Sequence, residues 1–152
     1  MNTPAHVVNS FDLTVALPYE KAATLFGPEG ERPWAGPTWD PHFIYPQPAR
    51  DQQGAVFTIA HGDHTAIWVN TLFDLNAHHF QYVYVIPEVM TATINVLFHS
   101  IDASHTAVHV TYARTALTPE ANDRVIALGK QDAASGPEWQ SAIEDYLNKS
   151  TH

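Results

Sequence analysis

The stretch from Pro119 to Leu147 has the residue spacing of one long amphipathic helix. A Thr, a Pro and an acidic residue occupy positions 118–120, and this combination is a strong signal for the start of a helix. Residues that recur at steps of three and four lie on one helical face. On this face are Val125, Leu128, Asp132, Ser135 or Gly136, Trp139, Ile143 and Tyr146. The rest of the chain must provide a surface that covers it.

The middle of this face is small and polar where bulky residues are expected. Asp132, Ser135 and Gly136 stand where a core helix would carry Leu or Ile. Because an unfilled space in a packed interior costs about 24 cal/mol per Å³, the pattern predicts that something other than side chains fills the space beneath the helix. The alternative is that Gly136-Pro137 breaks the helix in two, with Pro137 beginning the second piece. A break would not exclude a pocket.

The preceding chain has the pattern of short strands. A first strand is predicted from apolar residues that alternate with polar or small ones, namely Phe11, Leu13, Val15 and Leu17. A short helical segment from Tyr19 to Phe26 and an irregular, Pro- and Gly-rich stretch at 28–41 follow. Further strands are predicted near 41–46, 54–61, 65–74, 79–87, 91–101 and 105–116. Tight turns such as His61-Gly62-Asp63-His64 make successive strands antiparallel.

An antiparallel sheet and one long helix have one economical arrangement, in which the sheet curls around the helix and buries one face. The alternation assigns to this buried face Phe80, Tyr82, Tyr84, Ile86, Val108, Val110, Tyr112 and Arg114. We therefore predict an α+β fold, with a curved seven-stranded antiparallel sheet wrapped around a long C-terminal helix and two short helices after the first strand. At 152 residues the chain suits one domain, residues 1–152.

Composition excludes several classes of function. Seven Lys and Arg against 16 Asp and Glu give a formal net charge of −9, and nucleic acids and anionic membranes both require clustered positive charge. We therefore expect neither as a partner. The chain has no Cys, which rules out disulfides, thiolate metal sites and a cysteine nucleophile. Without a signal peptide or an apolar run of membrane length, a cytoplasmic protein is predicted.

Several scattered aromatic and turn positions resemble those of a known superfamily. They are the opening at 11–26, the Trp34/Trp39 segment, and the stretches 54–57, 68–74, 84–87 and 106–112, followed by the long last helix. From about Val7 to Leu147 this pattern resembles the SRPBCC superfamily. That group includes START lipid-transfer domains, birch-pollen-allergen-like proteins, and the polyketide cyclase/dehydrase-like and heat-shock-ATPase-activator-like branches. The resemblance implies a helix-grip fold with a cavity for an apolar or aromatic molecule, but no catalytic residue, because the superfamily shares none.

We expect the cavity to be lined by aromatic side chains and a few polar groups, as small-molecule sites usually are. The predicted ligand-binding residues are Trp39, Phe57, Trp68, Tyr82, Tyr84, Tyr112, Arg114, Asp132, Gly136 and Trp139. Trp34 and Trp39 lie in an irregular segment, where paired Trp residues either plug one end of a core or line the mouth of a pocket.

Arg114 is the polar residue of greatest interest, because it ends an inward-facing row where a charge is costly unless paired. If it is buried, the carboxylate or phenolate of a ligand could be its partner. Alternatively, it lies at the edge of the sheet and pairs with Asp132 or Glu120. Asp132 is either an acid within the cavity or an exposed helical residue. Arg114, Asp132 and Tyr112 are the candidate catalytic residues.

The ten histidines do not form a recognisable metal site. His61 and His64 flank a turn, but zinc needs three or four ligands. We predict no metal and no cofactor. An acid–base role for His42 or His61 remains open, although no carboxylate stands at a telling spacing. Neither a nucleophile elbow nor a phosphate-binding or dinucleotide-binding motif is present.

Three hypotheses of function follow. The first is a protein that binds or carries a hydrophobic or aromatic small molecule in the cavity. The second is a cofactor-independent enzyme of the cyclase/dehydratase kind, or another lyase or isomerase, that acts on a polyketide-like substrate there. The third is a partner-binding module, which predicts an exposed apolar patch and a filled interior. Any of the three is compatible with a homodimer.

Overall fold

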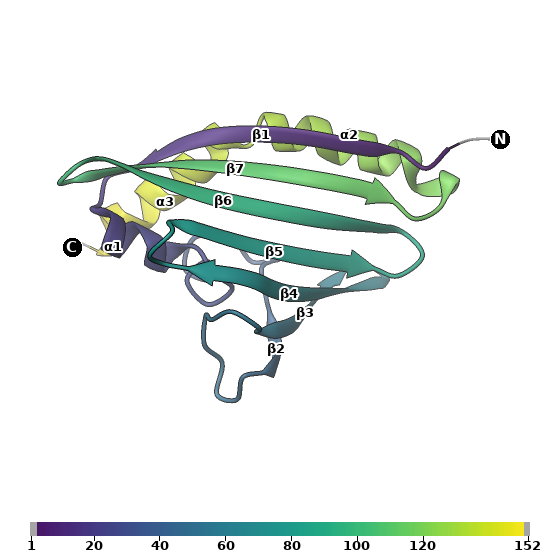
Figure 1. Cartoon of the computed structure of the whole chain (residues 1–152), viewed down its shortest axis with the longest axis horizontal. Helices are drawn as coiled ribbons and strands as arrows, with labels where there is room; N and C mark the ends of the chain where they lie inside the picture. Colours follow the sequence, from purple (N-terminus) through teal and green to yellow (C-terminus); the bar gives the residue numbers. More distant parts are fainter. Residues whose placement is uncertain (1–2, 151–152) are drawn as a thin grey trace.

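Seven antiparallel strands form one open sheet in the computed structural model, which describes residues 3–150 (Figure 1). The strands are β1 (His6–Val15), β2 (His42–Tyr45), β3 (Val56–His61), β4 (His64–Asp74), β5 (His79–Ile86), β6 (Met90–Asp102) and β7 (His105–Ala116). Their order across the sheet is β1-β7-β6-β5-β4-β3-β2. The last six strands therefore form a meander, and β1 closes it by pairing with β7.

The alternation of apolar and polar residues gives the sheet one buried face. Phe80, Tyr82, Tyr84 and Ile86 are buried on β5, and Val108, Val110 and Arg114 are buried on β7, as predicted. Trp68 on β4 also faces the interior. The turn between β3 and β4 has Gly62 at φ +60°, in the left-handed region that this tight hairpin requires.

The first strand lies further toward the N-terminus than predicted. It spans His6–Val15 because it pairs with β7 along nearly the whole length of that strand, from His6 opposite Thr115 to Val15 opposite Thr106. Leu17 was predicted to belong to this strand but lies beyond the last of these pairs, because the apolar alternation in the sequence extends past the end of β1.

Helical segments cover the buried face of the sheet. Two short ones follow β1, as predicted: α1 (Tyr19–Ala22) and the 3-10 turn η1 (Ala23–Leu25). After β7 come η2 (Pro119–Ala121), α2 (Asn122–Ala133) and α3 (Gly136–Ser150). The C-terminal helix is thus divided, as the second interpretation of Gly136-Pro137 required, with the break at residues 134–135. Both α2 and α3 pack along β1 (Figure 1).

The hydrophobic core lies between the sheet and these helices. Its largest fully buried side chains come from the loop after η1, three strands (β3, β5 and β6) and α3; they include Phe26, Phe57, Phe80, Ile86, Met90 and Ile143. The predicted α+β helix-grip fold is confirmed. No helix within residues 3–150 combines the length and the apolar character that crossing a membrane requires.

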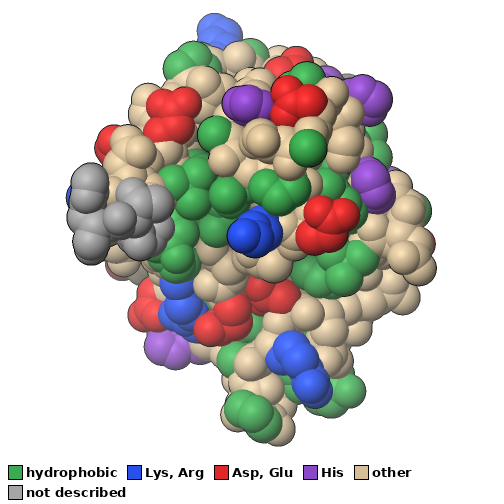
Figure 2. All heavy atoms as spheres, turned by 90° about the vertical axis from the view of Figure 1, so that its left-hand side faces the viewer, with side chains coloured by type: hydrophobic (Ala, Val, Ile, Leu, Met, Phe, Trp, Pro, Cys, Tyr) green, Lys and Arg blue, Asp and Glu red, His purple; other side chains and the backbone are tan. Residues whose placement is uncertain are grey.

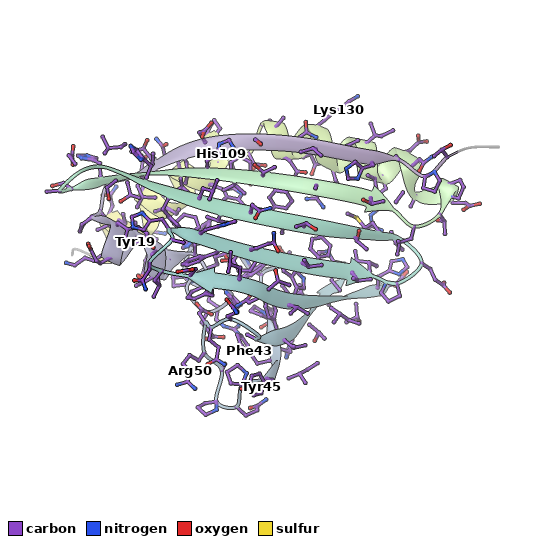
Figure 3. All side chains as sticks on the ribbon, in the orientation of Figure 1. Tyr19, Phe43, Tyr45, Arg50, His109 and Lys130 are labelled. Carbon is purple, nitrogen blue, oxygen red and sulfur yellow. The ribbon has the colours of Figure 1, made fainter. Side chains whose placement is uncertain are left out.

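The outer surface is mixed in character. Figure 2 views the end of the molecule at which α1 and α3 lie, and charged side chains interrupt the hydrophobic ones there. Figure 3 shows Lys130 on the outer side of α2, and Tyr45 and Arg50 at the far end of the sheet beside β2.

Candidate ligand cavity

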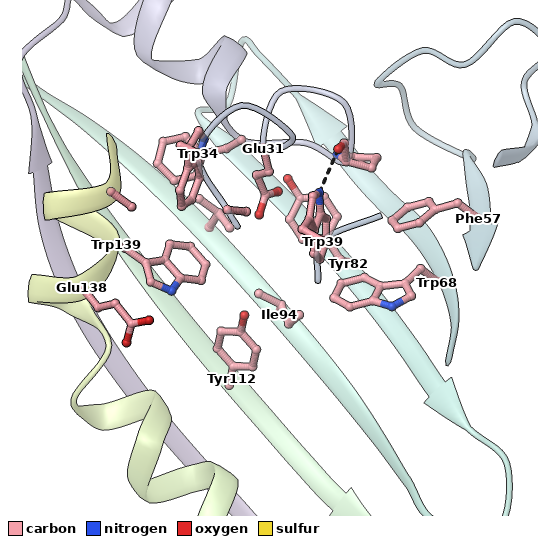
Figure 4. A pocket seen from close by; sticks show the side chains of 15 residues that line it. Glu31, Trp34, Trp39, Phe57, Trp68, Tyr82, Ile94, Tyr112, Glu138 and Trp139 are labelled. Carbon is pink, nitrogen blue, oxygen red and sulfur yellow. Dashed lines mark hydrogen bonds between the residues drawn. The ribbon is translucent and has the colours of Figure 1, made fainter. Parts of the chain in front are cut away.

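A cavity of about 190 Å³ lies between the sheet, the irregular segment after η1 and α3 (Figure 4). Its aromatic walls are Phe26, Trp34, Trp39, Phe57, Trp68, Tyr82, Tyr112 and Trp139. All four tryptophans of the chain are in this set. Because a cavity of about 150 Å³ in another protein holds benzene, the space here suffices for a molecule with one aromatic ring.

The irregular segment carries two of the tryptophans and holds them by hydrogen bonds to its own backbone. The Nε1–H of Trp34 donates to the carbonyl oxygen of Leu25 (2.9 Å), and the Nε1–H of Trp39 donates to that of Pro28 (2.9 Å; dashed in Figure 4). Each ring then packs edge-on against a partner across the cavity: Trp34 against Trp139, with centroids 5.5 Å apart, and Trp39 against Trp68, with centroids 5.4 Å apart. Both tryptophans therefore line the cavity and join the core.

Two acidic residues, Glu31 and Glu138, line this cavity, and Glu31 is the buried one, with only 9% exposed. Its carboxyl points into the space between Trp34 and Trp39 (Figure 4). One oxygen accepts a hydrogen bond from the backbone N–H of Gly27 (3.1 Å). Burial raises the pKa of Glu31 to about 8; that hydrogen bond lowers it, and the nearby Asp51 raises it further. At neutral pH the carboxyl is mostly protonated.

Two tyrosine hydroxyls also belong to the cavity. The hydroxyl of Tyr82 is buried and has no hydrogen-bond partner within residues 3–150, and that of Tyr112 points toward the centre of the cavity (Figure 4). Burial raises the pKa of both, and Glu31 contributes to the shift at Tyr82. Both therefore stay neutral and can donate or accept a hydrogen bond. A buried hydroxyl without a partner costs about 1–3 kcal/mol, which a polar ligand atom would offset.

Arg114 is buried, as the first alternative required, and it pairs with Asp132, as the second alternative proposed. It is 5% exposed, and two hydrogen bonds join it to Asp132 in α2: Nε donates to Oδ2 (2.7 Å) and Nη2 donates to Oδ1 (2.9 Å). A third bond runs from Nη1 to the hydroxyl of Tyr84 (2.5 Å). Burial, the largest single cause, lowers the pKa of Arg114, but the bonds to Asp132 and the electrostatic effects of Tyr84, Asp132 and Tyr112 together raise it. Two of the three candidate catalytic residues, Arg114 and Asp132, thus form a buried ion pair, and Asp132 is not exposed.

Gly136 does not line the cavity, contrary to the role predicted for it. A Cβ at this position would lie 2.5 Å from the carbonyl oxygen of Asp12 in β1. Its lack of a side chain therefore allows α3 to approach the sheet. Gly129 does the same for α2, where a Cβ would lie 2.7 Å from Nδ2 of Asn9. The middle of the helical face is small and polar because of these close contacts and because Asp132 forms an ion pair there.

Eight of the ten predicted ligand-binding residues divide between two neighbouring pockets, and Asp132, like Gly136, lines neither. Lining the 190 Å³ cavity are Trp39, Phe57, Trp68, Tyr82, Tyr112 and Trp139. Tyr84 and Arg114 line a second pocket of about 230 Å³, together with Trp39, Trp68 and Tyr112, which are common to both. Nothing in the sequence pattern indicated Glu31, because it lies in a segment without periodicity. In the part of the chain that the structure describes, no three His, Asp or Glu residues are grouped as a metal would require.

Comparisons with known proteins support the fold. No family model and no curated protein matches the sequence. Among solved structures, norcoclaurine synthase from Thalictrum flavum in complex with dopamine and hydroxybenzaldehyde is 14% identical, with a TM-score of 0.67 over 97% of this chain and 87% of that one. The Zhui aromatase/cyclase from Streptomyces sp. R1128 is 16% identical, with a TM-score of 0.65 over 96% of each chain. Ara h 8.0201 is 15% identical, with a TM-score of 0.64 over 95% of this chain and 99% of that one. These likenesses confirm the predicted fold.

Proposed function

We propose that this protein binds a small hydrophobic molecule with one aromatic ring in the cavity between the sheet and α3. Its fold is that of norcoclaurine synthase and of an aromatase/cyclase. The observation that carries the proposal is a cavity of about 190 Å³ that all four tryptophans line. Protein interiors are normally packed without spaces larger than a water molecule, so a space of this size needs an occupant or a functional reason.

The polar groups of the cavity indicate what the ligand carries besides its ring. Glu31 is mostly protonated at neutral pH, and Tyr82 offers a buried hydroxyl without a partner within residues 3–150. Both suit a neutral hydroxyl or carbonyl group, because each can donate or accept a hydrogen bond. A ligand carboxylate beside Glu31 would be disfavoured, since two acidic groups would then share one buried site.

The tryptophans provide the test, because their fluorescence reports on this cavity. We expect 4-methylphenol to change the emission saturably. Ala142→Leu, which adds volume to the cavity wall, should weaken binding by about tenfold, equivalent to about 1.4 kcal/mol. Ala133→Leu is the matched control, because Ala133 is exposed on α2 and should leave affinity unchanged. Mass spectrometry of compounds extracted from the purified protein would identify a natural ligand. The proposal fails if single-ring probes give no saturable signal.

A second candidate function is a cofactor-independent enzyme of the cyclase/dehydratase or isomerase kind. It is favoured by Glu31, because a carboxyl with a pKa of about 8 inside a largely apolar cavity is suited to act as a general acid or base near neutral pH. Glu31→Gln separates the two functions. A carrier should keep most of its affinity, whereas an enzyme should lose turnover while its binding is largely kept.

The third hypothesis, a partner-binding module, required a filled interior. The 190 Å³ cavity does not meet that condition, so this function is not proposed.

A further inference from the structure

We infer that the second pocket, beside the aromatic cavity, is a subsite for an oxyanion group, such as the carboxylate of an aromatic ligand. The inference rests on the proposed function for the aromatic part of that ligand, because Trp39, Trp68 and Tyr112 line both pockets. The anionic group itself would be held by three residues that do not line the aromatic cavity, Arg114, Arg124 and His61, and by the indole N–H of Trp68.

Positive charge is concentrated at this pocket in a protein that is otherwise acidic. Two of the seven Lys and Arg residues, Arg114 and Arg124, line it together with His61. The Arg114 charge is balanced by Asp132. The Arg124 guanidinium has no ion-pair or hydrogen-bond partner among the residues that the structure describes, and no acidic residue from that range lines the pocket. One positive charge is therefore left for a ligand.

Trp68 supplies a donor that lacks an acceptor. It is buried, with 6% exposed, and its Nε1 atom has no hydrogen-bond partner within residues 3–150. In Figure 4 the six-membered ring of Trp68 faces the aromatic cavity, and Nε1 lies on the opposite edge of the indole. An indole N–H can only donate, so the partner it lacks must be an acceptor. An oxyanion is the strongest acceptor available.

His61 adds a second ring nitrogen at the same pocket. Its Nε2 atom is buried and likewise has no partner in the described chain. Burial, followed by the charges of Arg124 and Arg114, lowers the pKa of His61, which indicates that these groups act on one another. A bound anion would reverse the effect of the two arginines. Its oxygens would also supply the acceptor that His61 lacks.

Arg114 is held ready for such a group by its neighbours. Its bonds to Asp132 and Tyr84 use three N–H groups, and a guanidinium has five. The guanidinium carbon also lies 4.6 Å from the centroid of the Tyr112 ring. Arg114 therefore stays in place without a ligand and retains two donors for one.

Phenylacetate and phenylacetamide test the inference, because they share a ring and differ in charge. By isothermal titration calorimetry we expect the wild-type protein to bind phenylacetate about tenfold more tightly, as a charge-assisted contact implies. Arg124→Gln should remove this preference and leave the affinity for phenylacetamide unchanged. Lys130→Gln is the matched control, because it removes the same charge from the outer side of the same helix (Figure 3). Trp68→Phe removes the donor and also part of the wall that both probes contact, so it should weaken phenylacetate more than phenylacetamide.

The possible outcomes separate this inference from the proposed function. If the wild type binds both probes equally and Arg124→Gln changes neither affinity, the oxyanion subsite is refuted and the proposed aromatic site is unaffected. If neither probe binds, the proposed function fails for single-ring ligands. Inorganic phosphate then decides whether the subsite exists by itself. A phosphate-induced shift of the Trp68 indole N–H resonance that Arg124→Gln abolishes supports the subsite, and the absence of a shift refutes it.

Discussion

Replacing Glu31 with Gln should remove a pH dependence of stability that this buried carboxyl imposes. The pKa of Glu31 is about 8 in the folded protein, against an ordinary value of 4.5. The folded state therefore binds more protons than the unfolded state between these values, and stability falls as pH rises. The contribution is fully present below 4.5 and is lost as pH rises through about 8.

The size of this effect follows from the two pKa values. At about 1.36 kcal/mol per unit, the interval between 4.5 and about 8 corresponds to at most about 5 kcal/mol. Of this, about 4 kcal/mol is lost between pH 5 and pH 9. In Glu31→Gln the amide can still accept the hydrogen bond from Gly27, but it does not ionise. From pH 5 to pH 9 the free energy of unfolding of the wild type should therefore fall by about 4 kcal/mol more than that of the variant.

Urea unfolding at pH 5, 7 and 9 measures the effect. The difference between wild type and Glu31→Gln isolates Glu31, because the histidines and other carboxyls are common to both proteins. Glu120→Gln removes an exposed carboxyl and should run parallel to the wild type. If Glu31→Gln also runs parallel to the wild type from pH 5 to pH 9, the carboxyl is hydrated and the argument for a protonated group in the cavity is refuted.

Three further perturbations test the packing around the cavity. Asp132→Asn leaves the buried Arg114 without its counter-charge and should lower the free energy of unfolding in urea by about 3–5 kcal/mol. Adding Arg114→Met should recover part of this loss, and a loss below about 1 kcal/mol for Asp132→Asn would mean that water reaches the pair. Gly136→Ala places a methyl group 2.5 Å from the carbonyl oxygen of Asp12 and should destabilise the fold by about 1–3 kcal/mol, and an unchanged urea midpoint would show that α3 does not lie so close to β1. Tyr82→Phe removes a buried hydroxyl that has no partner within residues 3–150, so the free protein should be as stable or more stable by about 1 kcal/mol, while its affinity for 4-methylphenol falls; a clear loss of stability would reveal a partner for the hydroxyl.

The sheet and its buried face could be predicted from the sequence because both depend on local periodicity. Alternation along β5 assigned Tyr82 and Tyr84 to the interior, and short turns made the strands antiparallel. The same alternation placed Arg114 inside the fold. The Gly136-Pro137 pair offered a divided helix as one of two open interpretations, since Gly and Pro are poorly tolerated within a helix. Each of these inferences needs only neighbouring residues.

Only the tertiary structure decided what the buried polar groups contact. Arg114 and Asp132 come from a strand and a helix, and their pairing depends on how α2 packs over β7. Glu31 lies in a loop without periodicity, and its carboxyl is buried in the folded chain between Trp34 and Trp39. Gly136 is small because the backbone of β1 passes beside it, which no pattern within α3 could indicate. Periodicity shows which face an element buries, whereas the partner of a buried charge is set by elements that lie far apart in the chain.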